Sequence, residues 1–267
     1  MRPIILAHRG GAALAPENTA SAFDNGVACG VDGLECDVHL SRDGVPVVIH
    51  DSTVDRTTNG TGAVLDLTAA ELAALDAGYR FARDGEFPFR DQGIGVPTLG
   101  DVFDRYPHVS LLVELKSANP RLASLVVEQI RAVDGIGRIT VGSFHQGALD
   151  AVRACDPRIR TGADIDEIKS ELAAAVCGSG VRTPPFQSFQ VPELYAGMRV
   201  VTREFITRAH DVGVSVIVWT VDREQDILRL LEWGVDGLIT DRPDIAVPVV
   251  REWAGAGTGG RVFGLRV

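Results

Sequence analysis

Short apolar runs alternate with longer amphipathic stretches along most of the chain. The run Ile4–Ala7 is apolar without alternation, which is typical of a parallel strand buried on both faces. Comparable runs recur, and we expect further strands at Gly33–Val38, Val45–Ile49, Val109–Leu115, Ile139–Ser143, Ile159–Ala163, Phe186–Val191, Val214–Trp219 and Gly237–Ile239.

Apolar residues at helical spacing fill most of the intervals between these strands. The segment Pro16-Glu17-Asn18-Thr19 predicts a helix start, with Asn18 or Thr19 as N-cap, and this helix is expected to run to about Cys29. Further helices are expected at Arg121–Val133, Gln146–Ala154, Ile165–Cys177, Arg203–Val212, Arg223–Trp233 and Pro243–Trp253. Repeated strand-then-helix order implies right-handed crossovers and a parallel sheet.

About eight strands begin such units, near residues 4, 33, 110, 139, 159, 187, 214 and 237. Because a closed parallel barrel needs eight, the sequence predicts an α/β fold of the TIM-type (β/α)8 class. A doubly wound open sheet is the alternative. It is disfavoured because His8-Arg9-Gly10-Gly11, after the first strand, does not match the Gly-x-Gly-x-x-Gly turn of dinucleotide-binding sheets.

One region is too long for an ordinary connection. Residues at about 52–98 are expected to form a small insertion after the second barrel strand, with a short helix near Thr68–Leu75 and an aromatic cluster between Tyr79 and Phe89. The insertion is either a structural flap or a lid over the barrel mouth. We expect residues 1–253 to form a single barrel domain and residues 254–267 to form a Gly-rich tail.

Composition limits the partners. Hydrophobic residues make up 45% of the chain and charged residues 23%, as in ordinary globular proteins. The net charge of −10 disfavours general affinity for nucleic acid or anionic lipid. No apolar stretch is long enough to suggest stable membrane insertion, and no signal peptide is recognisable, so a cytoplasmic location is expected. The oligomeric state stays open. The cysteines are predicted to be free thiols because they form no CxxC pair: Cys29, Cys36, Cys155 and Cys177.

Polar side chains concentrate where the predicted strands end. His8 and Arg9 follow the first strand, and His50 follows the run Val45–Ile49. Glu35 and Asp37 are two residues apart near the end of the second strand, so they share one face. The same spacing places Glu114 and Lys116 side by side on one face of theirs. We expect all of these groups at the carboxyl-end mouth of the barrel, where such barrels have their active sites.

Three carboxylates meeting at this mouth would repel one another unless a cation bound among them. Glu35, Asp37 and Glu114 are therefore predicted to bind a divalent cation, and their hard oxygen atoms suit Mg²⁺ or Ca²⁺ better than zinc. The alternative is a salt-bridge network in which these acids pair with Arg9 and Lys116.

His8 and His50 are the expected acid–base pair because imidazole titrates nearest to neutral pH. Arg9 and Lys116 are expected to bind the oxygen atoms of an anionic substrate. Trp219 either contacts the substrate or caps the core. The remaining histidines are interpreted as ordinary structural or surface residues: His39, His108, His145 and His210.

The same motifs in the same order resemble the glycerophosphodiester phosphodiesterase family. They are His8-Arg9-Gly10, Pro16-Glu17-Asn18-Thr19, Glu35-x-Asp37, His50-Asp51, Glu114-Leu115-Lys116, Ser143-Phe144, Val218-Trp219-Thr220-Val221 and Gly237-Leu238-Ile239-Thr240-Asp241-Arg242-Pro243. The resemblance extends from Ile4 to about Val250. It implies a TIM barrel with an insertion after the second strand, a divalent cation on Glu35, Asp37 and Glu114, and acid–base catalysis by His8 and His50.

The activity implied by the resemblance is hydrolysis of a small-molecule glycerophosphodiester to glycerol 3-phosphate and an alcohol. The glycerol 2-hydroxyl is the implied nucleophile, and it gives a cyclic phosphate that water then opens. One alternative is a phospholipase D-like or lyase activity on lysophospholipids with the same barrel and cation site. A second is an enolase-type metal barrel, which would not need the two histidines. A third is a phosphate-binding barrel without catalysis.

Overall fold

The computed structural model describes residues 2–170 and 184–256, and its core is a parallel sheet that curls into a barrel. The sheet order is β6-β5-β4-β2-β1-β11-β10-β7. These strands are β1 Ile4–Ala7, β2 Gly33–Leu40, β4 Ser110–Leu115, β5 Ile139–Gly142, β6 Arg160–Thr161, β7 Ser188–Pro192, β10 Ser215–Trp219 and β11 Gly237–Thr240. A parallel bridge between Gly162 and Ser188 connects β6 to β7. The predicted TIM-type barrel is confirmed.

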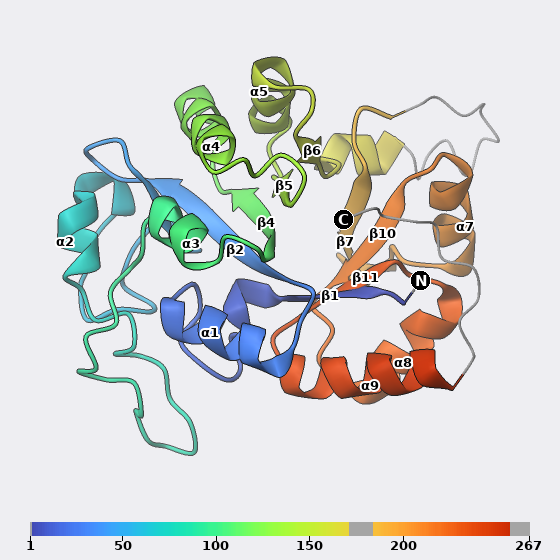
Figure 1. Cartoon of the computed structure of the whole chain (residues 1–267), viewed down its shortest axis with the longest axis horizontal. Coiled ribbons are helices and arrows are strands. Elements are labelled where there is room, and N and C mark those ends of the chain that lie inside the picture. The colour runs from blue at the N-terminus through green and yellow to red at the C-terminus, as the bar shows by residue number, and fades with distance from the viewer. Residues whose placement is uncertain (1, 171–183, 257–267) are drawn as a thin grey trace.

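Helices pack around the outside of the strands (Figure 1). They are α1 Ala20–Cys29, α3 Leu99–Arg105, α4 Pro120–Ala132, α5 Gln146–Cys155, α7 Arg203–Asp211, α8 Glu224–Trp233 and α9 Pro243–Gly255. Residues 165–170 are also helical, and the rest of the helix predicted at Ile165–Cys177 lies outside the described residues. Two large apolar clusters between helices and strands form most of the core.

The sequence interpretation missed helix α3. Its signal is a capping box, in which the Thr98 side chain accepts a hydrogen bond from the Asp101 N–H and the Asp101 carboxylate accepts from the Thr98 N–H. At α1 the N-cap is Thr19, whose hydroxyl accepts a bond from the Ala22 N–H, and Asn18 is left for another role.

The insertion contains the 3-10 turn η2 Val64–Asp66 and helix α2 Ala69–Ala73. It has a small apolar core of its own under β3 Pro46–Val48, which includes Val54, Val64 and Leu72. In Figure 1 it lies at one side of the molecule, away from α7 and α8. The predicted short helix is thus present as α2.

The predicted C-terminal tail begins at residue 254. Helix α9 continues through Gly255, two residues into the predicted tail, and residues 257–267 lie outside the described part of the chain. The division into one domain and a tail stays a prediction.

Three of the four cysteines are free thiols, as predicted: Cys29, Cys36 and Cys155. The fourth, Cys177, lies outside the described residues.

Strand β3 differs from the expected pattern. It pairs antiparallel with the end of β2, Val38 opposite Val48, so it is an addition to the barrel and not one of its parallel strands. Because β2 extends beyond the barrel rim to Leu40, β3 runs back towards the rim, and the Ile49 N–H donates to the Asp37 carbonyl. His50, two residues after β3, therefore lies at the mouth of the barrel.

Candidate active site

A hollow of about 140 Å³ opens at the carboxyl ends of the barrel strands. All eight residues that the sequence singled out line it: His8, Arg9, Glu35, Asp37, His50, Glu114, Lys116 and Trp219. Closing the sheet into a barrel brings these strand ends around one space, although the chain between the first and the last of them is more than two hundred residues long. We call this space the mouth hollow.

The three predicted acids converge in it. Oxygen atoms of Glu35, Asp37 and Glu114 lie within 4.8 Å of one another. Lys116 Nζ is 2.7 Å from a Glu114 oxygen and 3.3 Å from an Asp37 oxygen. Arg9 Nε is 3.2 Å from Asp37. Both cations thus contact the cluster, as the salt-bridge alternative requires.

Glu35 distinguishes a cation site from a salt-bridge network. Its side chain is buried, and among the described residues no lysine or arginine side chain pairs with it. It accepts a hydrogen bond from the Arg9 N–H, at 2.9 Å, and His8 Nε2 lies 4.0 Å from its carboxylate. Burial and the charge of Asp37 raise the pKa of Glu35 to about 8. A divalent cation would supply the missing positive charge, so the cluster fits a hard cation such as Mg²⁺ or Ca²⁺.

Asp37 and its neighbours are held by the loop after β1. Asn18, at φ 58°, donates through Nδ2 to Asp37 Oδ2 at 2.8 Å and accepts from the Asp37 N–H at 3.2 Å. Burial would raise the pKa of Asp37, but the charges of Lys116 and Arg9 outweigh it, and this pKa is lowered. The Asp37 carboxylate is therefore charged and fixed in place.

His8 is oriented by an acid from the last barrel strand. Its Nδ1 lies 2.8 Å from an Asp241 oxygen, so Nδ1 holds the proton of the neutral ring and Nε2 faces Glu35. Burial opposes the charged ring, but the hydrogen bond to Asp241 and the charge of Glu35 outweigh it and raise the pKa of His8. Asp241 was not singled out from the sequence as a functional residue.

His50 has a similar arrangement with its own neighbour. Its Nδ1 lies 2.6 Å from Asp51 Oδ1, which leaves Nε2 free to face a reacting group. Arg56 donates to Asp51, and this contact holds the pKa of Asp51 down to about 2. The His50 carbonyl accepts from His39 Nε2 at 3.0 Å. His39, interpreted as an ordinary residue, thus supports the backbone of His50.

Arg56 also reaches the other side of the mouth. Its two terminal nitrogens donate to the two Glu17 oxygens, at 2.7 and 2.8 Å, and Glu17 accepts from Arg9 at 2.9 Å. One insertion residue therefore joins the acid that orients His50 to the acid that orients Arg9. Glu17 belongs to the Pro-Glu-Asn-Thr motif, but its partner Arg56 carried no signal in the sequence interpretation.

The opposite wall of the mouth hollow is aromatic. Trp219, at the end of β10, packs edge-on against Phe144, with ring centroids 5.9 Å apart. Gln190 of β7 also lines the mouth hollow. None of residues 52–98 lines the hollow, and the Tyr79–Phe89 cluster packs within the insertion, where Arg90 stacks on Tyr79 and Phe87.

This barrel and its mouth are those of a phosphoric diester hydrolase. The model of the Glycerophosphoryl diester phosphodiesterase family matches residues 8–245. The chain belongs to this family, as the resemblance of its motifs predicted.

Relatives and solved structures agree with this assignment. The chain is 35% identical to a glycerophosphodiester phosphodiesterase of Caldanaerobacter subterraneus, over 94% of this chain and 99% of that protein. It is similar to the crystal structure of a glycerophosphodiester phosphodiesterase from Agrobacterium tumefaciens, with 28% identity, a TM-score of 0.75 and coverage of 92% and 99% of the two chains. A phosphodiesterase of Oleispira antarctica, solved in complex with the product sn-glycerol-3-phosphate, matches with 25% identity, a TM-score of 0.74 and coverage of 94% and 97%.

In the described ranges 2–170 and 184–256, no helix combines the length and the apolar character needed to cross a lipid bilayer. The predicted location in the cytoplasm stays a prediction.

Proposed function

We propose that this protein hydrolyses glycerophosphodiesters to glycerol 3-phosphate and an alcohol, with a divalent cation bound by Glu35, Asp37 and Glu114. The observation that carries the proposal is the meeting of these three acids with two imidazoles in one hollow. The relatives named above act on this substrate class by name, and one was solved with its glycerol phosphate product.

The substrate's phosphate is the group that this mouth would recognise. Arg9 and Lys116 would donate to its non-bridging oxygens, and they offset the charge that develops there during reaction. Burial opposes the charged amine, but the charges of Asp37 and Glu114 raise the pKa of Lys116, so it stays protonated. A divalent cation on the three acids would add Lewis-acid polarisation of the same phosphate. The identity of the cation, Mg²⁺ or Ca²⁺, is decided by metal titration.

His8 and His50 would carry the protons. One imidazole removes the proton of the attacking glycerol 2-hydroxyl as its oxygen bonds to phosphorus. The other protonates the alcohol oxygen as its bond to phosphorus breaks, and water then opens the cyclic ester to glycerol 3-phosphate. The carboxylate on each Nδ1 supports this use of the pair, because it leaves Nε2 as the nitrogen that exchanges a proton. Trp219 and Phe144 would pack on the carbon atoms of the substrate.

The direct test is the release of glycerol 3-phosphate and choline from glycerophosphocholine in the presence of Mg²⁺ or Ca²⁺. We expect saturable release, whereas a barrel that only binds phosphate would give none. Vesicles of lysophosphatidylcholine form the second arm of the assay. Release from the vesicles alone would replace this proposal with the phospholipase D-like alternative, and a cyclic end product would indicate a lyase.

Replacing Arg56 with alanine is expected to lower kcat about tenfold, with a smaller change in KM. The variant removes the common partner of Asp51 and Glu17. His50 and Arg9, which these two acids orient, then lose their fixed positions. Arg56 is half exposed, so the effect is smaller than that of a buried ion pair. The R56K variant should recover only part of the rate, since lysine cannot contact both acids bidentately.

The matched control is R42A. Arg42 is comparably exposed and pairs with Glu71 of α2, but it touches no residue of the mouth hollow. Equal rates for R42A and R56A, at unchanged stability of both proteins, would remove Arg56 from the machinery that positions His50.

A further inference from the structure

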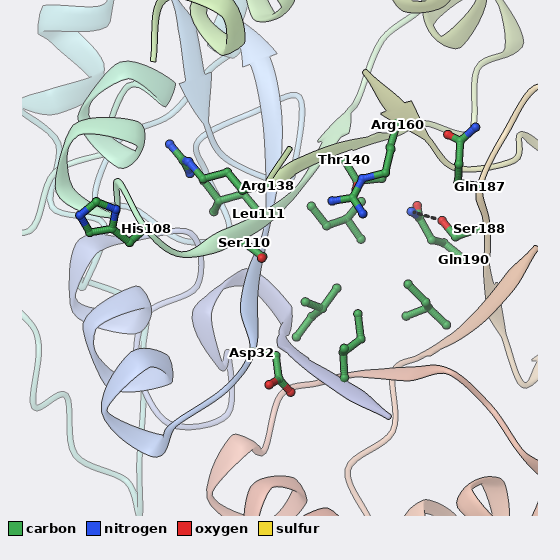
Figure 2. Close-up of a pocket in the computed structure, with 14 residues that line it drawn as sticks. Asp32, His108, Ser110, Leu111, Arg138, Thr140, Arg160, Gln187, Ser188 and Gln190 are labelled. Atoms are coloured by element: carbon green, nitrogen blue, oxygen red, sulfur yellow. Dashed lines mark hydrogen bonds between the residues drawn. The ribbon is translucent and has the colours of Figure 1, made fainter. Parts of the chain in front are cut away.

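A second and larger hollow, of about 310 Å³, opens at the opposite end of the barrel. Figure 2 shows it among residues that precede or begin the strands, including Ser110, Arg138, Thr140 and Arg160. An apolar layer of four buried side chains lies between the two hollows: Leu6, Leu112, Ile217 and Ile239. The barrel ends facing away from active sites usually serve stability, so a polar hollow there needs a physical explanation.

Two arginines on neighbouring strands reach this lower hollow. Arg160 is the register partner of Thr140, and Arg138 lies two residues before Thr140 on the same face of its strand. In Figure 2 the Arg160 guanidinium extends towards the middle of the lower hollow, next to Thr140. The side chain of Arg138 forms the adjacent wall, and its guanidinium lies on the side of His108, turned away from Arg160.

Both guanidiniums bond to backbone carbonyls. Arg138 Nη1 bonds the carbonyls of Tyr106 and Val109, and Arg160 Nη2 bonds the carbonyl of Gly137. Within the described residues no carboxylate pairs with either arginine, and Arg138 Nε, Arg138 Nη2 and Arg160 Nε are buried without an acceptor. These three nitrogens have almost no accessible surface, so they do not open into the lower hollow, and the group that faces it is the end of the Arg160 guanidinium. A guanidinium at a hollow without a carboxylate partner favours an anionic ligand that accepts from its N–H groups.

The charge balance of the lower hollow is positive. Its lining contains one carboxylate, Asp32, which is bonded to Arg2 and to the Ile5 N–H and is therefore already committed. Burial lowers the pKa of both Arg138 and Arg160, which shows that their charges are held at a cost. This happens in a chain with a net charge of −10, where a guanidinium that faces a hollow without a carboxylate partner, as Arg160 does, is unexpected.

We propose that the lower hollow binds a small oxyanion, free phosphate or the phosphate group of a phosphomonoester, at the Arg160 guanidinium. Guanidinium N–H groups match the oxygen geometry of phosphate, and the hydroxyls of Thr140 and Ser110 supply further donors. A volume of about 310 Å³ corresponds to roughly ten water molecules at ~30 Å³ each, which is enough for phosphate and its first waters. Leu112 and Gln190 line both hollows, but the site at Arg160 contains none of the residues assigned to the proposed activity and does not depend on it.

The test is calorimetric titration of the full chain with inorganic phosphate in excess EDTA, which removes divalent cations from the mouth. We expect saturable binding with a Kd of ~1 mM or tighter that chloride at equal ionic strength does not reproduce. The R160Q variant should weaken it at least tenfold, and R138Q, whose guanidinium is turned away from Arg160, should weaken it less. A parallel titration with glycerol 3-phosphate distinguishes free phosphate from a phosphomonoester as the preferred ligand.

Two controls locate the binding. R158Q removes an exposed arginine two residues before Arg160 that is already paired with Asp156, and K116Q removes a cation of the mouth hollow. Both should leave the Kd unchanged. Binding lost in K116Q and kept in R160Q would place the anion at the mouth and overturn the proposal.

A crystal of the unaltered protein soaked in selenate gives a test that needs no variant and is therefore independent of their folding. Anomalous density next to Arg160 supports the site. Density at the mouth alone, or no density together with no heat of phosphate binding, contradicts it.

Discussion

Alanine in place of His50 is expected to lower the turnover of glycerophosphocholine about 100-fold or more, and His8→Ala is expected to do the same. Each imidazole faces the mouth hollow through Nε2 while a carboxylate fixes its Nδ1, at 2.6 Å for His50 and 2.8 Å for His8. Removing either ring takes away one of the two proton transfers, and among the described residues that line the hollow there is no third histidine to replace it. The measurement is kcat with Mg²⁺ and with Ca²⁺ at saturating substrate.

The matched control for both variants is H145A. His145 is exposed, lies near the same end of the barrel after Ser143-Phe144, and lines no part of the mouth hollow. It should keep the full rate. Circular dichroism and thermal unfolding should show the H8A and H50A proteins folded. A folded H50A or H8A protein with near-normal turnover would show that the acid–base pair is wrongly assigned.

Chelation of divalent cations by EDTA is expected to abolish activity, and added Mg²⁺ or Ca²⁺ should restore it. Glu35→Gln should weaken cation binding by two orders of magnitude or so, since it removes one of three charged ligands. Glutamine keeps the shape of the buried side chain and removes the repulsion with Asp37, so the cation-free E35Q protein should be at least as stable as the parent.

Stability also reports on the cation without an activity assay. A ligand that binds only the folded state raises Tm, so the parent protein should unfold at higher temperature in Mg²⁺ or Ca²⁺ than in EDTA. E35Q should lose most of this increase. Glu86→Gln serves as the control, because Glu86 is an exposed insertion residue outside the acidic cluster. Full activity in excess chelator would remove the cation from the proposed function.

Much of the fold could be predicted because its signals are local. Apolar runs and amphipathic stretches are determined by a few neighbouring residues, and they indicated all eight barrel strands. The errors also have local causes. Helix α3 has only seven residues and was overlooked despite its capping box, and β3 has the composition of a barrel strand although it pairs antiparallel with the end of β2.

The candidate site divides in the same way. Glu35 and Asp37 share a face because strand side chains alternate, and the structure brings both into the mouth hollow with Glu114. The partner of His8 could not be found from spacing, because Asp241 lies 233 residues away along the chain. Arg56, 39 residues from Glu17, is in an insertion whose path no periodicity describes.

The sequence by itself determined the barrel class, the strand ends that carry polar groups and the family, since all three depend on residue types in order along the chain. Only the tertiary structure decided which carboxylate holds each imidazole, how the insertion reaches the mouth through Arg56, and that Arg160 faces the lower hollow with no carboxylate partner among the described residues. The physical reason is that ion pairing and burial depend on distances between residues remote in sequence, and those distances are set when the sheet closes on itself.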